Sequence, residues 1–388
     1  MKNLMKTLSI ITVFSLLLVG MSSAVGVGAN GNTNVNTSLV RDVTVGNAPI
    51  VKVKWEMNGP FVSLSGTDDD DASGAQFTPP GVWNAKKNIS FCAIVTDPDG
   101  VDDINAVYAD IYYPLTTAFH PMGTPADVIA GGNPILEPNP IEAPDYGVNG
   151  CGLPVGDEIG LTKLSKDNGI ALFCNTIRTT NEDLPTFYSP YNYDEICNAD
   201  GELQKETAYV YCGDREITWE DPAGLYDVDV FAQDKTAIDS NILRNQFEYL
   251  PLTSYEVDFT SVNYGNVKLN THKKISGDLT FGSADKPTVR NLGNTRLRMN
   301  VNQTDMGLGT TNGLSNVKFD ARVGNNELDW VDYNPATTTW LEDLLDLSQF
   351  EEMDFSILVT KFPNPVGPWT GTMTLGAEQA DFRVCEDE

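Results

Sequence analysis

The sequence predicts an all-β protein made of two β-sandwiches in tandem, the first interrupted by a long insertion. Short segments alternate between apolar and polar residues with a period of two, which is typical of half-buried strands. Other apolar runs are bounded by turns rich in Asp, Pro and Gly, and the whole pattern starts again after residue 252. A chain of 388 residues is long enough for more than one such domain.

The first sandwich is expected over residues 48–252. Its opening strand reads PIVKVKWEM, in which Val51, Val53 and Trp55 alternate and should share one face. Two further strands, NISFCAIVT and AVYADIYYP, flank the turn DPDG, whose glycine Gly100 supplies a positive φ. The strands and their connecting turn favour a layer of a β-sandwich.

Residues 115–205 break this strand pattern. They contain many prolines, glycines and asparagines and three of the cysteines. The stretch LTKLSKDNGIALFCNTI predicts one short helix within them. We therefore expect a disulfide-containing insertion in a loop of the first sandwich, a position where binding functions are common.

The stretch DPAGLYDVDVFAQD, after the insertion, is the most specific structural signal in the chain. A turn precedes Tyr226, and Val228 and Val230 then alternate inward. This arrangement resembles the tyrosine corner of immunoglobulin-like (Ig-like) domains, in which antibody domains place a cysteine where this chain has Val228. We expect tandem Ig-like sandwiches without the usual bridge between the two sheets, and a Cys92–Cys212 disulfide as the replacement for that inter-sheet bridge.

The second sandwich is expected over residues 253–388. The segments TVRNLGNTRLRMNVNQT and NVKFDARVG predict strands separated by turns. The stretch TTTWLEDLLDLSQF places Trp340, Leu341, Leu344 and Leu345 on one helical face, after a threonine that can act as an N-cap. This spacing predicts one short helix in the second sandwich.

The N-terminus predicts export from the cell. Lys2 and Lys6 precede an apolar core followed by small residues, so residues 1–24 are expected to be a signal peptide, with a retained membrane anchor as the alternative. Residues 25–47, rich in Gly, Asn, Thr and Val, are expected to form a flexible arm. No later apolar run has membrane length, so we expect a mature chain without a transmembrane segment, secreted or at the cell surface.

The charge of the chain limits the classes of partner that it can bind. The formal net charge is −29 and the pI is about 4.2. A surface this acidic repels phosphate backbones, which argues against nucleic-acid binding, and it attracts cations.

Export permits disulfides. The six cysteines are Cys92, Cys151, Cys174, Cys197, Cys212 and Cys385. None forms a CxxC pair and only two histidines exist, which argues against a zinc site. Because five cysteines lie in the first sandwich, complete pairing would require Cys385 to reach that sandwich or another subunit, and free thiols are the alternative.

One aspartate-rich stretch, VTDPDGVDDI, is a candidate cation site. It contains four aspartates: Asp97, Asp99, Asp102 and Asp103. An EF-hand loop is excluded, because placing the turn glycine at its sixth position puts a valine where the first carboxylate belongs. Two interpretations remain, a solvated turn between strands or a calcium site in a sandwich loop. Calcium is the only cofactor that the sequence suggests.

Two further sets of residues are candidates for surface functions. N-glycosylation sequons occur at Asn36, Asn88 and Asn302. A candidate sugar-binding platform in the stretch TFYSPYNYDE consists of Phe187, Tyr188, Tyr191 and Tyr193. Packing of the insertion explains the same aromatic residues equally well.

No motif indicates catalysis. Only His120 and His272 are available as imidazole bases, and the chain has no GxSxG elbow, phosphate-binding loop or dinucleotide fingerprint. Carboxylate pairs of the glycosidase type cannot be identified without geometry. We therefore expect a protein that is not an enzyme.

The strands TVRNLGN and TGTMTLGA resemble those of Ig-like modules in secreted archaeal cell-surface proteins, particularly those of methanogens. The resemblance implies a structural role outside the cell and carries over no catalytic residues. We expect a protein that assembles into or decorates a surface layer, sheath or filament, with other copies or other surface proteins as partners. Strand addition by the N-terminal arm is the expected mechanism. The alternative is a calcium-stiffened adhesin or a carbohydrate-binding surface module.

Overall fold

The computed structural model describes residues 46–63, 75–112, 156–178, 185–189, 191–219, 221–283, 286–364 and 367–380. The expected signal peptide, the arm up to residue 45 and much of the expected insertion lie outside the described residues. The same holds for Asn36, His120, Cys151 and Cys385, so the expectations about them stay predictions.

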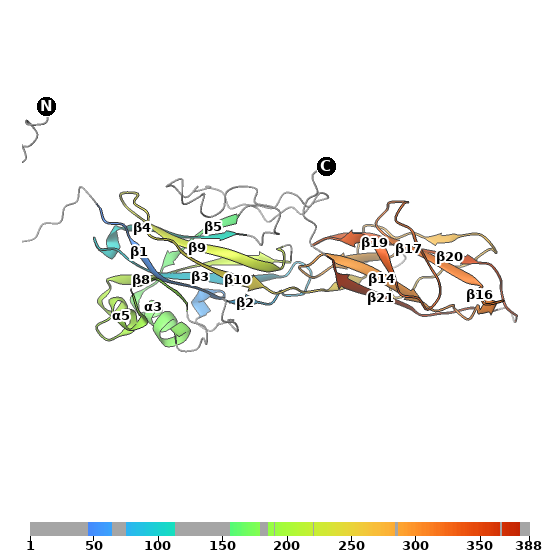
Figure 1. Cartoon of the computed structure of the whole chain (residues 1–388), viewed down its shortest axis with the longest axis horizontal. Helices are drawn as coiled ribbons and strands as arrows, with labels where there is room; N and C mark the ends of the chain where they lie inside the picture. Colours follow the sequence, from blue (N-terminus) through green and yellow to red (C-terminus); the bar gives the residue numbers. More distant parts are fainter. Residues whose placement is uncertain are drawn as a thin grey trace, which may run out of the picture. The chain divides into compact units, whose positions relative to one another are not determined.

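The first sandwich consists of two five-stranded sheets that share one core (Figure 1). One sheet has the order β6-β8-β3-β1-β7, and the other has the order β2-β10-β9-β4-β5. The strands of the first sheet are β1 (Ile50–Asn58), β3 (Lys86–Thr96), β6 (Thr162–Lys163), β7 (Thr186–Phe187) and β8 (Ala208–Thr218). The strands of the second sheet are β2 (Gln76–Phe77), β4 (Ile104–Tyr112), β5 (Gly156–Gly160), β9 (Gly224–Asp234) and β10 (Leu243–Tyr249).

Strand β3 is almost continuously apolar from Ile89 to Val95, because both of its faces are buried there. Phe91 and Val95 lie in the core between the two sheets. Cys92 and Ile94 lie in a separate apolar cluster on the other side of the same sheet, beneath the helices. A strand covered on both sides gives a continuous apolar run rather than an alternating one.

Strand β1 contains a β-bulge that changes which residues point inward. Its register against β3 shifts between Val51 and Val53. Val51 therefore lies in the inter-sheet core, whereas Val53 and Trp55 lie in the cluster beneath the helices. The expectation that these three side chains share one face was wrong, because the bulge turns the side chains that follow it. After the bulge, the polar residues Lys54 and Glu56 are the ones buried toward the sandwich interior.

Short helices cover the outer face of the sheet that contains β1, β3 and β8 (Figure 1). They are α3 (Lys166–Leu172), a π-helical turn η3 (Phe173–Ile177), α5 (Tyr193–Cys197) and α6 (Glu202–Lys205). The Ser165 hydroxyl caps α3 by accepting a hydrogen bond from the amide of Asn168, and Asn192 caps α5 by accepting from the amide of Glu195. The helix expected in LTKLSKDNGIALFCNTI is thus present.

Part of the expected insertion belongs to the sandwich itself. Strand β5 pairs with β4, placing Ile159 opposite Ala109, and β6 pairs with β8. Each of these strands extends one of the two sheets at its edge. The sequence did not indicate this, because both segments are short and carry few apolar residues.

Two disulfides lie among the described residues. Cys92 and Cys212 are joined, and they lie directly opposite each other on the neighbouring strands β3 and β8. The expected pairing is therefore present, but its expected role as an inter-sheet bridge was wrong, because both cysteines belong to one sheet and face the helices. Cys174 and Cys197 join η3 to α5.

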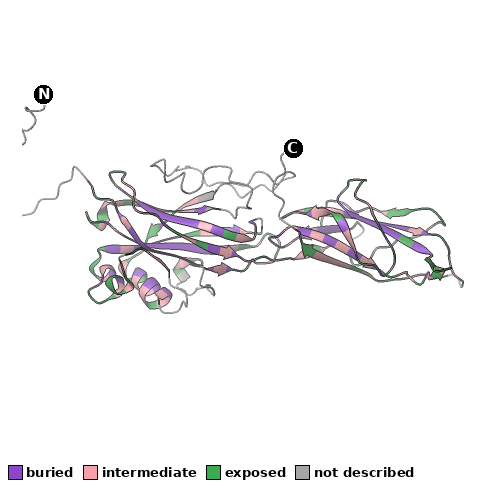
Figure 2. Ribbon diagram, viewed as in Figure 1, coloured by how far each residue is buried: buried purple, intermediate pink, exposed green. Residues whose placement is uncertain are grey.

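The second sandwich has its own core, and its first strand, β11, begins at Tyr255, two residues after the expected domain start at residue 253 (Figure 2). One sheet has the order β11-β13-β20-β17-β18 with β12 also pairing with β20, and the other has the order β19-β14-β21. The strands of the larger sheet are β11 (Tyr255–Val257), β12 (Lys273–Ile275), β13 (Thr288–Asn291), β17 (Val317–Val323), β18 (Val331–Tyr333) and β20 (Phe350–Val359). The remaining strands are β14 (Leu297–Gln303), β19 (Thr339–Leu345), β21 (Met373–Gln379) and the hairpin β15 (Thr310–Thr311) with β16 (Leu314–Ser315).

The helix expected in TTTWLEDLLDLSQF was wrong, because this segment forms strand β19. It pairs with β14, placing Leu345 opposite Leu297. Leu341, Leu345 and Leu347 are buried. Residues separated by four share a face of a helix and also a face of a strand, so their spacing did not distinguish the two structures.

None of the helices in the described parts of the chain has the length and apolar character needed to cross a membrane.

Candidate metal site

The aspartate-rich stretch forms the connection from β3 to β4, which crosses from one sheet of the first sandwich to the other. The amide of Gly100 donates to the carbonyl of Asp97 over 2.9 Å, and Gly100 has a φ of 111°. The amide of Asp99 donates to Oδ1 of Asp97 over 2.7 Å. A short 3-10 turn, Val101–Asp103, then leads into β4. The turn expected from DPDG is therefore present, and it connects two layers rather than two neighbours in one layer.

Three carboxylates of this connection converge. Asp97, Asp99 and Asp103 each offer one oxygen atom, and these oxygens lie within 4.8 Å of one another. Calcium binds oxygen ligands at about 2.4 Å, so two oxygens on opposite sides of one ion lie about 4.8 Å apart. The three side chains therefore fit the ligand sphere of a single cation.

Asp97 is the buried member of the group. It is 5% exposed, and within the described part of the chain its Oδ2 atom has no hydrogen-bond partner. Burial raises the pKa of the Asp97 carboxyl above its ordinary value, and the amide of Asp99 opposes this rise. The negative charges of Asp103 and Asp234 raise the pKa further. A buried carboxylate oxygen with no donor, beside other carboxylates, is a position that a cation would stabilise.

Two other segments meet this connection. The backbone amide of Asn47 donates to Oδ2 of Asp99 over 2.6 Å, and the Asn47 side-chain amide donates to Oδ1 over 3.1 Å. From the β9–β10 connection, the amide of Lys235 donates to the carbonyl of Asp103 over 2.9 Å. Asp234, the last residue of β9, is buried and accepts from the backbone amides of residues 236 and 238. Asn47 and Asp234 could not be assigned to this site from the sequence, because no local pattern links residues so distant in the chain.

Asp102 does not belong to the converging group. Its side chain is exposed, although it is adjacent in sequence to Asp103. Of the four aspartates proposed from sequence, the structure therefore brings together three.

The four aromatic residues of the candidate sugar platform divide into two pairs. Phe187 and Tyr193 pack edge to face with ring centroids 5.0 Å apart, against the apolar cluster beneath the helices. The Tyr193 hydroxyl donates to the carbonyl of Pro185 over 2.8 Å, and burial raises its pKa to about 12. Tyr188 and Tyr191 form a second pair, 5.9 Å apart, nearer the surface. Packing therefore accounts for the first pair, and only the second is placed to meet a ligand.

Both described sequons lie within strands. Asn88 is in β3 and is partly buried, and the hydroxyl of Ser90 in the same sequon donates to Asp214. Asn302 is in β14, and its side-chain amide donates to the hydroxyl of Thr338 over 3.0 Å. Neither site is on a protruding loop, where glycosylated asparagines are usually found.

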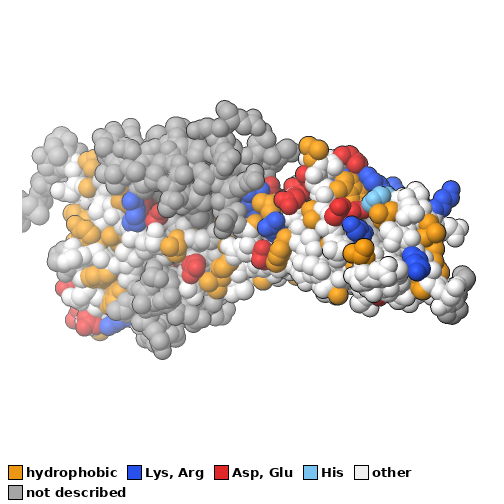
Figure 3. Space-filling view, turned by 45° about the vertical axis from the view of Figure 1, so that its right-hand side comes forward, with side chains coloured by type: hydrophobic (Ala, Val, Ile, Leu, Met, Phe, Trp, Pro, Cys, Tyr) orange, Lys and Arg blue, Asp and Glu red, His pale blue; other side chains and the backbone are white. Residues whose placement is uncertain are grey.

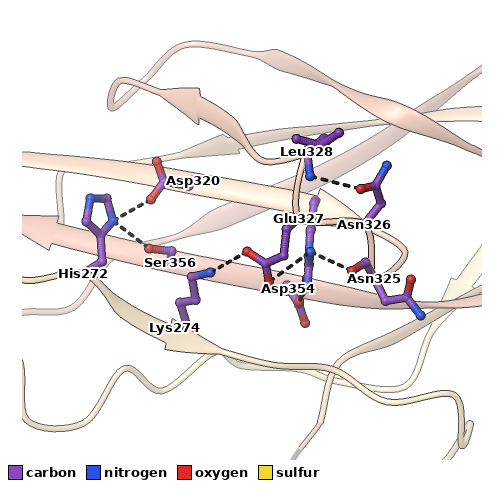
Figure 4. Close-up of polar contacts among 10 residues, drawn as sticks. His272, Lys274, Asp320, Asn325, Asn326, Glu327, Leu328, Asp354 and Ser356 are labelled. Atoms are coloured by element: carbon purple, nitrogen blue, oxygen red, sulfur yellow. Dashed lines mark hydrogen bonds and ion pairs between the residues drawn. The ribbon is translucent and has the colours of Figure 1, made fainter.

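His272 lies beside an aspartate and a serine, but in the wrong geometry for a catalytic triad (Figure 4). Its Nδ1 atom is 2.9 Å from Oδ2 of Asp320 and 3.1 Å from Oγ of Ser356. A triad histidine uses one ring nitrogen for the acid and the other for the nucleophile. Here both partners meet the same nitrogen, so the histidine cannot relay a proton between them.

Charges are mixed on the surface of the second sandwich. Lys274 donates to Glu327 over 3.1 Å (Figure 4). In the same sandwich, Arg322 pairs with the buried carboxylate of Asp354. On the face shown in Figure 3, Asp and Glu side chains are interspersed with Lys and Arg. This distribution favours a solvated protein surface.

No family model and no curated protein matches the chain. Among solved structures, the C-terminal domain of the AgI/II polypeptide BspA of Streptococcus agalactiae has 13% sequence identity and a TM-score of 0.21, over 86% of this chain and 96% of that one. The C-terminal domain of the antigen I/II-family protein AspA of Streptococcus pyogenes has 14% identity and a TM-score of 0.23, over 84% and 95%. A chaperone–tip adhesin complex of CFA/I fimbriae has 8% identity and a TM-score of 0.19, over 85% and 84%. With TM-scores this low, the functional argument depends on the residues of this chain.

Proposed function

We propose that this chain is an exported surface protein whose first sandwich binds calcium and acts as a stiffened binding or adhesion module. The observation that carries the proposal is the buried Oδ2 atom of Asp97, which has no partner among the described residues and lies within 4.8 Å of oxygens of Asp99 and Asp103. Export is supported by the N-terminal sequence and by the two disulfides.

The electrostatics of the group favour a divalent cation. Three carboxylates held this close repel one another, and burial adds a desolvation cost for the charged form of Asp97. Protonation relieves this cost at low pH. At neutral pH, a cation with two positive charges relieves it without removing any hydrogen bond that the connection makes.

The ligand chemistry favours calcium over other ions. The group contains carboxylates only, without histidine or cysteine, which disfavours zinc. Magnesium requires a nearly ideal octahedron with short bonds, whereas calcium accepts irregular sets of loop oxygens. Backbone carbonyls and water would complete the coordination.

Calcium at this site would stiffen the end of the first sandwich. Asp99 is hydrogen-bonded to Asn47, at the start of the described chain, and the backbone of Asp103 is hydrogen-bonded to the β9–β10 connection. An ion held by both aspartates would fix these three segments to one another. Such an ion would stiffen this end of the first sandwich, which suits a module that projects a binding surface.

The direct test is calorimetric titration of calcium into the chelator-treated full-length chain, with thermal unfolding in parallel. We expect one bound ion, absent from an Asp97→Asn variant and retained in an Asp102→Asn control. At a calcium concentration about 100 times the Kd, stability should rise by about 2.7 kcal/mol. For a domain of about 200 residues this raises the Tm by about 5–10 °C.

The Asp97→Asn variant should differ from the wild type in its stability without the ion and in its response to the ion. In EDTA it should unfold at a higher temperature than the wild type, because it removes a buried charge that has like-charged neighbours. Adding calcium should leave the unfolding temperature of the variant unchanged, whereas it should raise that of the wild type. If calcium leaves the unfolding temperature of the wild type as unchanged as that of the variant, the proposal is wrong.

We also propose that the protein is not an enzyme. The one described histidine meets its serine and aspartate at a single ring nitrogen. Turnover of nitrophenyl ester or glycoside substrates that is lost in a His272→Ala variant would contradict this.

Assembly through strand addition is the second candidate, and one edge strand favours it. Among the described strands, β21 pairs with β14 only, so its outer edge can accept another strand. Thr374, the second residue of β21, is exposed. Electron microscopy should show polymers of the wild-type chain that are lost on deletion of residues 25–45 or in a Thr374→Lys variant. Polymers that persist in both variants would exclude this mechanism.

A further inference from the structure

Three polar side chains occupy positions in the core of the first sandwich where apolar residues are expected. Lys54 and Glu56 follow the bulge in β1 and lie opposite Ala93 and Phe91 of β3, both of which belong to the inter-sheet core. On the facing sheet, Asn245 of β10 lies opposite the core residue Val228 of β9. The side chain of Lys54 is completely buried, and that of Glu56 is 1% exposed.

These three side chains contact one another in a closed arrangement. Nζ of Lys54 donates to Oδ1 of Asn245 and, over 2.7 Å, to Oε1 of Glu56. The other oxygen of the same carboxylate, Oε2, accepts from Nδ2 of Asn245 over 2.6 Å. Lysine has only donors and a carboxylate only acceptors, so these contacts fix the orientation of the Asn245 amide. Glu56 thus bridges the amine and the amide nitrogen.

We propose that Lys54 and Asn245 form an intramolecular isopeptide bond, with Glu56 as the group that transfers the protons. The Nζ atom already contacts the amide oxygen, and the amide carbon is bonded to that oxygen at about 1.2 Å. A small side-chain rotation brings the nitrogen onto the carbon. The closed, water-poor core holds the two reacting groups together, which makes the reaction effectively unimolecular.

The protons and bonds balance without any other reactant. Nζ gives a proton to Oε1 of Glu56 and, as a neutral amine, attacks Cγ of Asn245. Glu56 then delivers a proton to Nδ2, the Cγ–Nδ2 bond breaks, and ammonia leaves. The remaining surplus proton of Nζ returns to Glu56, and a secondary amide joins the two side chains. Glu56 therefore acts as base and then as acid.

The environment favours the neutral amine that this attack requires. Burial lowers the pKa of the Lys54 amine, although the nearby negative charge of Glu56 opposes this. A buried amine of lowered pKa is a better nucleophile than a solvated lysine. By contrast, a buried lysine–carboxylate pair is a poor stabilising device, because desolvation offsets the attraction between its charges. A covalent reaction therefore accounts for these buried polar residues better than a contribution to folding stability does.

The bond would close a very large loop. Lys54 is in the first strand of the sandwich and Asn245 is in the last, 191 residues apart and in opposite sheets. A covalent link there joins the two sheets that the Cys92–Cys212 disulfide, lying within one sheet, leaves unlinked. It would also persist under reducing conditions.

The test is intact-mass spectrometry of the purified, folded full-length chain. We expect a mass lower than that of the reduced sequence by one ammonia, and a proteolytic fragment in which the peptides containing Lys54 and Asn245 are joined. The variants Glu56→Gln, Lys54→Arg and Asn245→Ala should each show the full mass calculated for their sequence. The Lys52→Arg variant is the matched control, because Lys52 is also buried and paired, with Glu202 and the ring of Tyr191. It should keep the link.

The wild-type result decides the question by itself, so a variant that fails to fold does not weaken the test. Recovery of Lys54 and Asn245 in separate peptides from folded wild-type protein, at full mass, would overturn the proposal. A link that still forms in folded Glu56→Gln protein would overturn the role of Glu56. Neither result depends on whether the aspartate group binds calcium.

Discussion

Glu351 offers a test of how burial and charge affect the stability of the second sandwich. It lies in β20 opposite Val289 of β13, and its Oε1 atom accepts from the side-chain amide of Gln349 over 2.6 Å. Burial raises the pKa of its carboxyl to about 7, and the charges of Asp343 and Glu352 contribute to the rise. The perturbation that we propose is the Glu351→Gln variant, which keeps the shape and removes the charge.

The sign of the expected pH dependence follows from proton linkage. The folded state holds a proton on Glu351 up to about pH 7, whereas the unfolded state loses it near the ordinary value of 4.5. The folded state therefore binds more protons between these values, and its stability falls as the pH rises through them. The upper limit of this loss is about 3 kcal/mol, and partial exposure of the side chain reduces it to about 1 kcal/mol.

The assay is calorimetric unfolding of the full-length chain at pH 5 and pH 7.5 in EDTA. For a domain of roughly 130 residues, the wild-type transition should fall by about 4 °C between the two conditions, beyond any change seen in the variant. Glu342→Gln, at an exposed position on β19, is the control and should behave like the wild type. An identical pH dependence in Glu351→Gln and wild type would refute the reasoning.

Two further predictions concern the first sandwich. The hydroxyl of the completely buried Tyr226 donates to the carbonyl of Pro222 over 2.8 Å, so Tyr226→Phe should lower the free energy of unfolding by about 1–2 kcal/mol in urea titrations, and an unchanged midpoint would show that the bond contributes nothing. The Cys92–Cys212 bridge spans 120 residues, so replacing both cysteines with alanine should cost about 4–5 kcal/mol by the loop-entropy estimate. A loss below about 1 kcal/mol would indicate that another constraint, such as the proposed isopeptide bond, already restricts the unfolded chain.

Local signals in the sequence were sufficient for the class of fold and for several of its parts. The tyrosine corner was predicted from the residues around Tyr226, and its hydrogen bond is present. The DPDG turn and the helix at Lys166–Leu172 were predicted in the same way. These features depend on backbone preferences and on side-chain hydrogen bonds within a few residues, which a sequence displays directly.

The candidate sites depend on contacts that no local signal shows. Asp97, Asp99 and Asp103 could be proposed because they are neighbours in sequence, but Asn47 could not. Asn245 gave no signal at all, since it meets Lys54 only when the two sheets pack.

The sequence by itself determined that this protein is an acidic chain of β-sandwich domains, because alternation and turns are local properties, and its N-terminal residues predict export. Only the tertiary structure decided which residues point inward and which segments become strands. A single bulge in β1 moved Lys54 and Glu56 into the core, and pairing with β14 made a strand of Thr339–Leu345. The physical reason is that a side chain's face and a segment's partner are set by neighbouring strands, which lie far away in the sequence.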